Sequence, residues 1–135
     1  MQVQPYLFFH GDCEQAVAFY GRALGATVIH QSRYQDSPEA LPAGMVPKGW
    51  ENKVMHVSLQ IGETTVMACD SADAKGFTGV QLSVNTRDMA QAKEVFGALS
   101  EGGTVTMPLA KTFWSEGFGM LTDRFGVPWM VNVDH

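Results

Sequence analysis

Charge of either sign is scarce in this chain of 135 residues. Charged side chains make up 17% of the sequence, below the roughly 25% that is usual in soluble domains, and the formal net charge is −5. The nine Lys and Arg residues form no basic run, whereas binding to nucleic-acid phosphates needs clustered basic side chains. We therefore expect no nucleic-acid partner. The shortage of charge also suggests a surface that is covered by a partner subunit or arranged around a ligand cavity.

Cysteine is also rare, and long hydrophobic runs are missing. Cys13 and Cys69 cannot build a disulfide framework, and no C-x-x-C pair is present, so each is expected to be a small buried residue in a reducing compartment. No apolar stretch approaches the ~18 residues that a membrane span needs. The first residues lack the charged start and apolar run of a signal peptide. These features predict a cytoplasmic protein with no membrane partner.

A helical pattern occurs twice. Apolar residues recur at helical spacing after Asp12 and again after Asp88, and each aspartate is followed three residues later by glutamine, Gln15 or Gln91. This spacing resembles a capping box at both helix starts. Gly25 is placed to end the first helix in a left-handed conformation. The 76-residue offset between the two patterns indicates a weak internal repeat.

Extended runs surround both expected helices. In the first half they cover residues 6–9, 27–30, 54–61 and 64–68, and in the second half 80–84, 104–107, 114–122 and 129–133. Each half therefore reads as a strand, a helix and three further strands. The sequence predicts an α+β fold of two βαβββ modules, 1–75 and 76–135, within one domain covering 1–135.

A long proline-containing connection, residues 35–52, interrupts the first half and carries Met45 and Trp50. Long connections in compact domains are often functional. A flap over a cavity, a clasp on a second subunit and a simple surface loop all fit this segment. Five acidic residues close to expected turns or loops are predicted to be solvated: Glu51, Glu63, Asp70, Asp73 and Glu116.

Several short segments carry a family resemblance over nearly the whole chain. They are 5–11 (PYLFFHG), 53–56 (KVMH), 107–109 (MPL), 112–114 (TFW) and 123–132 (DRFGVPWMVN). Together with the repeated βαβββ order, they resemble the vicinal oxygen chelate superfamily of glyoxalases, bleomycin-resistance proteins and dioxygenases. Within that superfamily the chain is most similar to the PhnB-like branch.

The resemblance implies that each half curls into a half-open cup and that two cups form a ligand cavity. Metal-dependent members place a His, Gln or Glu ligand on the first and fourth strands of each half. The resemblance assigns these positions to Pro5, Met67, Gly79 and Met130. Proline and glycine offer no side-chain donor and a thioether is a soft ligand, so we expect the usual metal site, and any metal cofactor, to be absent.

Period-two alternation from those four positions predicts which strand residues face the cavity. His56 stands out in an apolar strand, His10 follows the first strand, and Trp114 belongs to an aromatic group late in the chain. The predicted ligand-binding residues are Phe9, His10, His56, Thr65, Gln81, Ser83, Trp114 and Asn132. An apolar wall with a few polar side chains is typical of small-molecule sites, although a packed core would show a similar pattern.

We therefore predict a PhnB-like protein that binds a small organic molecule without the usual metal and forms a homodimer, as related folds do. No catalytic residue is assigned. An alternative is a glyoxalase-like or dioxygenase-like enzyme that holds a metal through off-pattern residues such as His10, His56 or Gln81. A second alternative is a member whose cavity is filled and whose role is structural.

Overall fold

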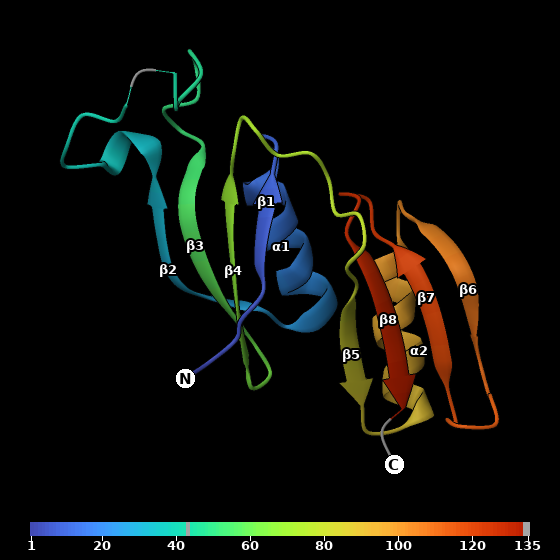
Figure 1. Cartoon of the computed structure of the whole chain (residues 1–135). Coiled ribbons are helices and arrows are strands. Elements are labelled where there is room, and N and C mark those ends of the chain that lie inside the picture. Colours follow the sequence, from blue (N-terminus) through green and yellow to red (C-terminus); the bar gives the residue numbers. More distant parts are fainter. Residues whose placement is uncertain (43, 134–135) are drawn as a thin grey trace. The chain divides into compact units, whose positions relative to one another are not determined.

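The computed structural model describes residues 1–42 and 44–133 (Figure 1). The chain folds as two compact units, Met1–Lys75 and Gly76–His135. Each unit has one mixed sheet of four strands and one α-helix that packs on a single face of that sheet. Within the described residues, neither helix is long and apolar enough to cross a membrane.

The first unit follows the predicted βαβββ order. Its elements are β1 (Tyr6–Phe9), α1 (Cys13–Leu24), β2 (Thr27–Arg33), a 3₁₀ turn (Tyr34–Asp36), β3 (Val54–Ile61) and β4 (Thr64–Asp70). The strand order in the sheet is β1-β4-β3-β2, with β1 parallel to β4 and the other neighbours antiparallel. Residues 37–42 and 44–52 of the long connection contain no strand or helix.

The second unit repeats this arrangement. Its elements are β5 (Leu82–Thr86), α2 (Met89–Ser100), β6 (Thr104–Ala110), β7 (Phe118–Thr122) and β8 (Pro128–Val133). The strand order is β5-β8-β7-β6, and the single parallel pair is again the one between the first and last strands. The predicted α+β fold of two βαβββ modules is thus confirmed.

Alternation along the strands places an apolar face of each sheet against its helix. In the first unit, Val57, Leu59 and Ala68 are nearly inaccessible to solvent and lie on the face that α1 covers. In the second unit, Leu121 and Val131 play the same part beneath α2. The core of each unit therefore lies between its sheet and its helix, and the other sheet face remains open.

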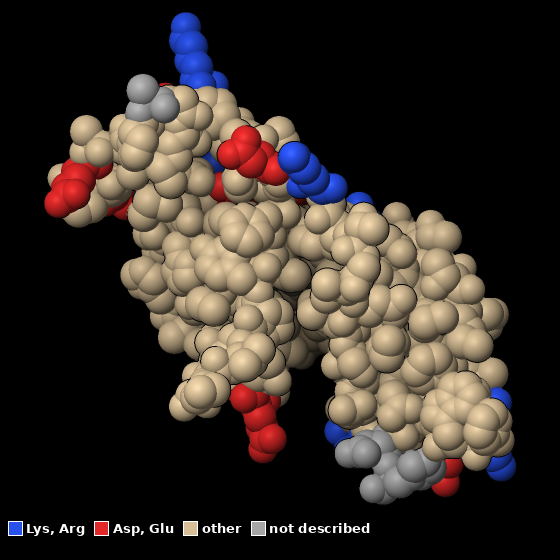
Figure 2. Space-filling model, in the orientation of Figure 1, with Lys and Arg blue, Asp and Glu red and all other residues tan. Residues whose placement is uncertain are grey.

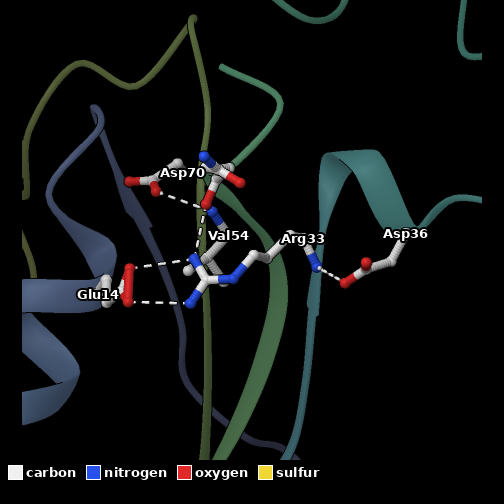
Figure 3. Close-up of polar contacts among 6 residues, drawn as sticks. Glu14, Arg33, Asp36, Val54 and Asp70 are labelled. Atoms are coloured by element: carbon white, nitrogen blue, oxygen red, sulfur yellow. Dashed lines mark hydrogen bonds and ion pairs between the residues drawn. The ribbon is translucent and has the colours of Figure 1, made fainter. Parts of the chain in front are cut away.

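A buried carboxylate organises the start of α1. Asp70, at the end of β4, is 1% exposed and accepts hydrogen bonds from the backbone N–H groups of Gly11 (2.9 Å), Cys13 (2.9 Å) and Val54 (3.1 Å). Figure 3 shows the bond to Val54 beside the Glu14–Arg33 ion pair. The expectation that Asp70 is solvated is therefore wrong, because its carboxylate satisfies buried backbone donors from three segments.

The second unit has its own buried carboxylate at a different place. Asp123 is 3% exposed and follows β7, where its Oδ1 accepts from the N–H groups of Phe125 and Val127. Its Oδ2 accepts from the indole Nε1 of Trp129 at 2.9 Å. These bonds fix the turn that leads into β8 and orient a large buried side chain.

Candidate functional site: the open sheet faces

The open face of the first sheet consists of uncharged side chains. Register places Tyr6 and Ser58 beside Met67, and Phe8 beside Cys69. Among the described strand residues on this face, none is Asp, Glu, Lys or Arg. In Figure 2, Lys, Arg, Asp and Glu side chains lie toward the ends of the unit, and uncharged residues cover its middle. A ligand on this face would meet polar and aromatic groups without fixed charge.

A short hydrogen-bonded chain crosses this face. The Tyr6 hydroxyl lies 3.0 Å from Nδ1 of His56, and Nε2 of His56 lies 3.1 Å from Oγ of Ser58. Both ring nitrogens of His56 are thus engaged by neutral hydroxyl groups. The phenol ring also stacks on Phe8, with centroids 4.9 Å apart, and the ring of His30 lies 6.2 Å from that of His56.

The Cys69 thiol lies beside the Tyr6 hydroxyl. Burial, followed by the proximity of Cys69, raises the pKa of Tyr6 to about 12, so the phenol remains a hydrogen-bonding group and not a phenolate. Burial also raises the pKa of the Cys69 thiol, although its contact with Tyr6 acts in the opposite direction. Because a thiolate is the nucleophilic form of cysteine, Cys69 is arranged as a neutral, buried thiol.

The open face of the second sheet is built from amides, hydroxyls and thioethers. Ser83 pairs with Met130, and Asn85 pairs with Asn132, which in turn lies opposite Phe118. Trp114, in the loop before β7, packs edge-on against Phe118 with centroids 5.5 Å apart. Three of the predicted site residues, Ser83, Trp114 and Asn132, therefore belong to this face or its margin.

The side chains of β1 lie on the sheet faces opposite to those predicted. Because Tyr6 pairs with Met67, the open face receives Tyr6 and Phe8, which are 37% and 49% exposed. Phe9 is only 2% exposed and lies on the buried face, and not on the open face where it was predicted. The run from Tyr6 to Phe9 is entirely apolar or aromatic, and such a run carries no alternation that could reveal which side faces the helix.

The other predicted site residues of the first unit, His56, Thr65 and His10, each contact different residues. His56 occupies the centre of the hydrogen-bonded chain, whereas Thr65 lies on the same face and contacts Gln60 through its hydroxyl. His10 is exposed at the end of β1, where its ring packs edge-on against Trp50 at 5.4 Å. Trp50 therefore ties the long connection to the end of β1.

Two open clefts are lined by residues other than those of the hydrogen-bonded chain. One, of about 350 Å³, is in the second unit and is lined by Gln81 together with Phe77, Gly79, Val80 and Pro128. The other, of about 310 Å³, lies along the 35–52 connection and is lined by Tyr34, Gln35, Ser37, Glu39, Leu41, Val46, Pro47, Lys48 and Glu51. Gln81 is exposed and precedes β5, so it is placed at a cleft and not on a strand.

Sequence reasoning missed Tyr6, Phe8 and Ser58 as members of the site. The signal for Ser58 was available, since it lies two residues from His56 on one strand and therefore on the same face. Tyr6 required the register between β1 and β4, which no local pattern gives. The contact between Tyr6 and Cys69 likewise depends on strand pairing.

The positions that the family resemblance assigns to metal ligands, Pro5, Met67, Gly79 and Met130, carry no imidazole, carboxylate or amide side chain. The paired open-face positions on β1 and β4 are Tyr6 and Met67, and those on β5 and β8 are Ser83 and Met130. The expected positions Pro5 and Gly79 both precede the first strand of their unit, where the residues paired with Met67 and Met130 are Tyr6 and Ser83. Two thioethers, a phenol and a hydroxyl do not supply the imidazole and carboxylate donors that Mn²⁺, Ni²⁺ and Zn²⁺ prefer. Across the described residues, no three His, Cys, Asp or Glu side chains group as metal ligands.

Comparison with known proteins gives consistent matches over the full length. Residues 2–131 match the Glyoxalase/Bleomycin resistance protein/Dioxygenase superfamily. The chain is 34% identical to the protein YjdN of Escherichia coli, over 98% of this chain and 95% of YjdN. The crystal structure of protein PA1353 from Pseudomonas aeruginosa is 43% identical, covers 99% of this chain and 98% of its own, and superposes with a TM-score of 0.87.

A second solved structure is more distant in sequence. It is that of a putative 3-demethylubiquinone-9 3-methyltransferase, the PhnB protein from Bacillus cereus, which is 26% identical. The match covers 99% of this chain and all of that protein (100%), with a TM-score of 0.79. These likenesses concern both βαβββ units and not one of them alone.

Proposed function

The chain belongs to the Glyoxalase/Bleomycin resistance protein/Dioxygenase superfamily, and from this premise we propose that it binds a small organic molecule on its open sheet faces without the family's usual metal. The observation that carries the proposal is the uncharged face of the first sheet, where aromatic rings adjoin the Tyr6–His56–Ser58 hydrogen-bonded chain. Apolar walls with a few placed polar groups are the usual composition of small-molecule sites. The PhnB-like branch is the part of the family we propose, supported by the Bacillus cereus relative.

The metal-free part of the proposal rests on the donor chemistry. The family resemblance assigns metal-ligand positions to Met67 and Met130, and a thioether is a poor partner for Mn²⁺, Ni²⁺ or Zn²⁺. His56 offers an imidazole on the same face, but both of its ring nitrogens are already bonded to hydroxyl groups. A metal at His56 would have to displace one of them.

The experiment is a thermal-shift screen of the full chain against a library balanced between uncharged, acidic and basic small molecules. We expect stabilising compounds whose binding weakens about tenfold in Phe8→Lys, because a lysine there places a charge on the uncharged face. Glu63→Lys, in the hairpin between β3 and β4, is the matched control and should bind as the wild type does. No stabilising compound, or binding that Phe8→Lys leaves unchanged, contradicts the proposal.

Metal analysis tests the second half of the proposal. Protein purified without added metal should contain no stoichiometric transition metal, and Mn²⁺, Ni²⁺, Zn²⁺ and Fe²⁺ should not raise its melting temperature. A stoichiometric ion that disappears in His56→Ala would instead favour the metal-dependent enzyme. A stoichiometric ion retained in that variant would also contradict the metal-free proposal and point to other ligands.

We further propose that the protein acts in the cytoplasm as a homodimer. The edge strands β2 and β6 support a subunit contact, because they expose Val28, Ile29, Val105 and Met107 beside unpaired backbone groups. Light scattering after size exclusion should give the mass of two chains. Ile29→Lys or Met107→Lys should yield monomers if the corresponding edge forms the contact, and a monomeric wild type contradicts the proposal.

A further inference from the structure

The hydrogen-bonded chain on the first sheet has a proton count that restricts what it can recognise. A neutral imidazole carries one N–H donor and one acceptor nitrogen. In His56 both nitrogens lie within hydrogen-bond distance of a hydroxyl, Tyr6 at one side and Ser58 at the other. One hydroxyl must therefore donate to the ring while the other accepts from it.

The accepting hydroxyl keeps its own proton for another partner. If Tyr6 donates to Nδ1, then Nε2–H donates to Ser58 and the surplus proton is on Ser58; the other tautomer leaves it on Tyr6. The chain thus carries one surplus neutral O–H donor, which is on Ser58 in the first tautomer and on Tyr6, beside the Cys69 thiol, in the second. A neutral donor of this kind matches an acceptor oxygen such as a carbonyl.

The surroundings of this donor disfavour a charged ligand. The described residues on this open face include no Lys or Arg that could pair with an anion and no Asp or Glu that could pair with a cation. Transferring an unpaired charge out of water is far more costly than transferring a neutral carbonyl that gains a hydrogen bond. The stacked rings of Tyr6 and Phe8, with planes 28° apart, provide an aromatic surface beside the donor.

We infer that the open face of the first unit selects an uncharged, planar molecule that carries a hydrogen-bond-accepting oxygen, with aryl ketones as the simplest class. This inference rests on the proposed function and makes it more specific, since ligand binding alone does not set the charge or the polar group of the ligand. The recognising groups are Tyr6, Phe8, His56 and Ser58.

The test compares three probes of similar shape with the full chain by equilibrium dialysis: 2-acetylnaphthalene, 2-isopropylnaphthalene and 2-naphthoate. We expect the ketone to bind about fivefold more tightly than the hydrocarbon, which lacks the acceptor, and about tenfold more tightly than the carboxylate. The triple variant Tyr6→Phe/His56→Phe/Ser58→Ala removes every donor of the chain and keeps the apolar surface. It should bind ketone and hydrocarbon equally.

Binding of the hydrocarbon by the triple variant shows that the open face is still formed. Ser100→Ala, which removes a hydroxyl at the end of α2, is the control substitution and should keep the preference for the ketone. Equal wild-type affinities for ketone and hydrocarbon, or tighter binding of the carboxylate, overturn the inference while ligand binding stands. Binding of none of the three probes also overturns it, and the library screen then decides independently whether the proposed function fails.

Discussion

The two helix entries share one sequence pattern but satisfy their backbone donors differently. At α2, Oδ1 of Asp88 accepts from the backbone N–H of Gln91 at 2.8 Å, and the Gln91 side chain accepts from the N–H of Arg87. At α1, Asp12 makes no side-chain capping bond, and Asp70 from β4 receives the nearby N–H groups. The same Asp-x-x-Gln pattern therefore forms a side-chain cap at α2 and none at α1, where Asp70 binds the N–H groups of Gly11 and Cys13.

This difference follows from where a buried carboxylate lies in each unit. In the first unit Asp70 lies beside the start of α1 and joins it to β3 and β4. In the second unit the buried carboxylate, Asp123, serves the turn between β7 and β8 and leaves α2 to cap itself. The same αβ arrangement is therefore stabilised through long-range bonds in one unit and more local bonds in the other.

The largest effect is expected for Asp70→Ala. The substitution leaves three backbone N–H groups without their acceptor, and each unsatisfied buried donor costs roughly 1–3 kcal/mol, so we expect a loss of about 4 kcal/mol in the free energy of unfolding. Urea denaturation followed by circular dichroism measures it. A loss below that of Asp88→Ala would contradict the role of Asp70 as the acceptor of three buried backbone donors.

Asp123→Ala should be nearly as damaging. It removes the acceptor of two backbone N–H groups and of the Trp129 indole, and we expect a loss of about 3 kcal/mol. Trp129→Phe, which removes only the indole donor, is the partial counterpart. Near-UV circular dichroism should report the altered Trp129 environment in Asp123→Ala, and an unchanged spectrum with unchanged stability would contradict the role assigned to this carboxylate.

Replacing the N-cap aspartate is expected to lower the stability by an intermediate amount at α2 and by a small amount at α1. Asp88→Ala should cost about 1 kcal/mol of unfolding free energy, the usual value for a lost N-cap. Asp12→Ala should cost less than about 0.5 kcal/mol, because this side chain makes no capping bond. Equal losses in the two variants, measured under the same denaturation conditions, would remove the distinction between the helix entries.

The smallest loss of stability is expected from disrupting the Glu14–Arg33 ion pair, which lies on the surface of the first unit. Hydrogen bonding to Arg33 holds the pKa of the Glu14 carboxyl below its ordinary value. The contribution of Glu14 is therefore present above the ordinary carboxyl pKa and is lost as the pH falls through the lowered pKa of the folded state. Because Glu14 is largely exposed, the effect should be smaller than that of Asp88→Ala.

Stability of Glu14→Gln measured against pH provides the check. The variant should be less stable than the wild type near neutral pH, and the two curves should converge in acid, where the wild-type carboxyl is protonated. About 1 M NaCl should narrow the gap at neutral pH by screening the pair. A gap that widens in acid would contradict the assigned sign.

The helices and most strands were predictable because their signals are local. Apolar residues at helical spacing identified α1 and α2, and Gly25 ends α1 in a left-handed conformation, φ 70°, as predicted. The strand containing His56 was found with its observed bounds, Val54–Ile61. The β5 strand, in contrast, starts two residues later than the expected run at Val80, so Gly79, which the resemblance assigned to a metal position, lies outside the strand.

The candidate site was only partly predictable, and Phe9 and Tyr6 show why. Both are aromatic residues on β1, and only pairing with β4 decides that Phe9 faces the core and Tyr6 the open side. A shift of one residue in register exchanges the two faces of a strand. His56 was recognisable by its type, but its bonds to Tyr6 and Ser58 require the folded sheet.

The sequence by itself determined the repeated βαβββ order and the low charge of the chain, because helical spacing, turn residues and composition act over short distances. Only the tertiary structure decided the register of β1 on β4, the hydrogen bonds of Asp70 at the start of α1, and the Tyr6–His56–Ser58 chain. The register and the bonds of Asp70 to Gly11 and Cys13 join residues at least 57 positions apart, and the Tyr6–His56 bond joins residues 50 positions apart. Those contacts are selected when each sheet buries one face against its helix.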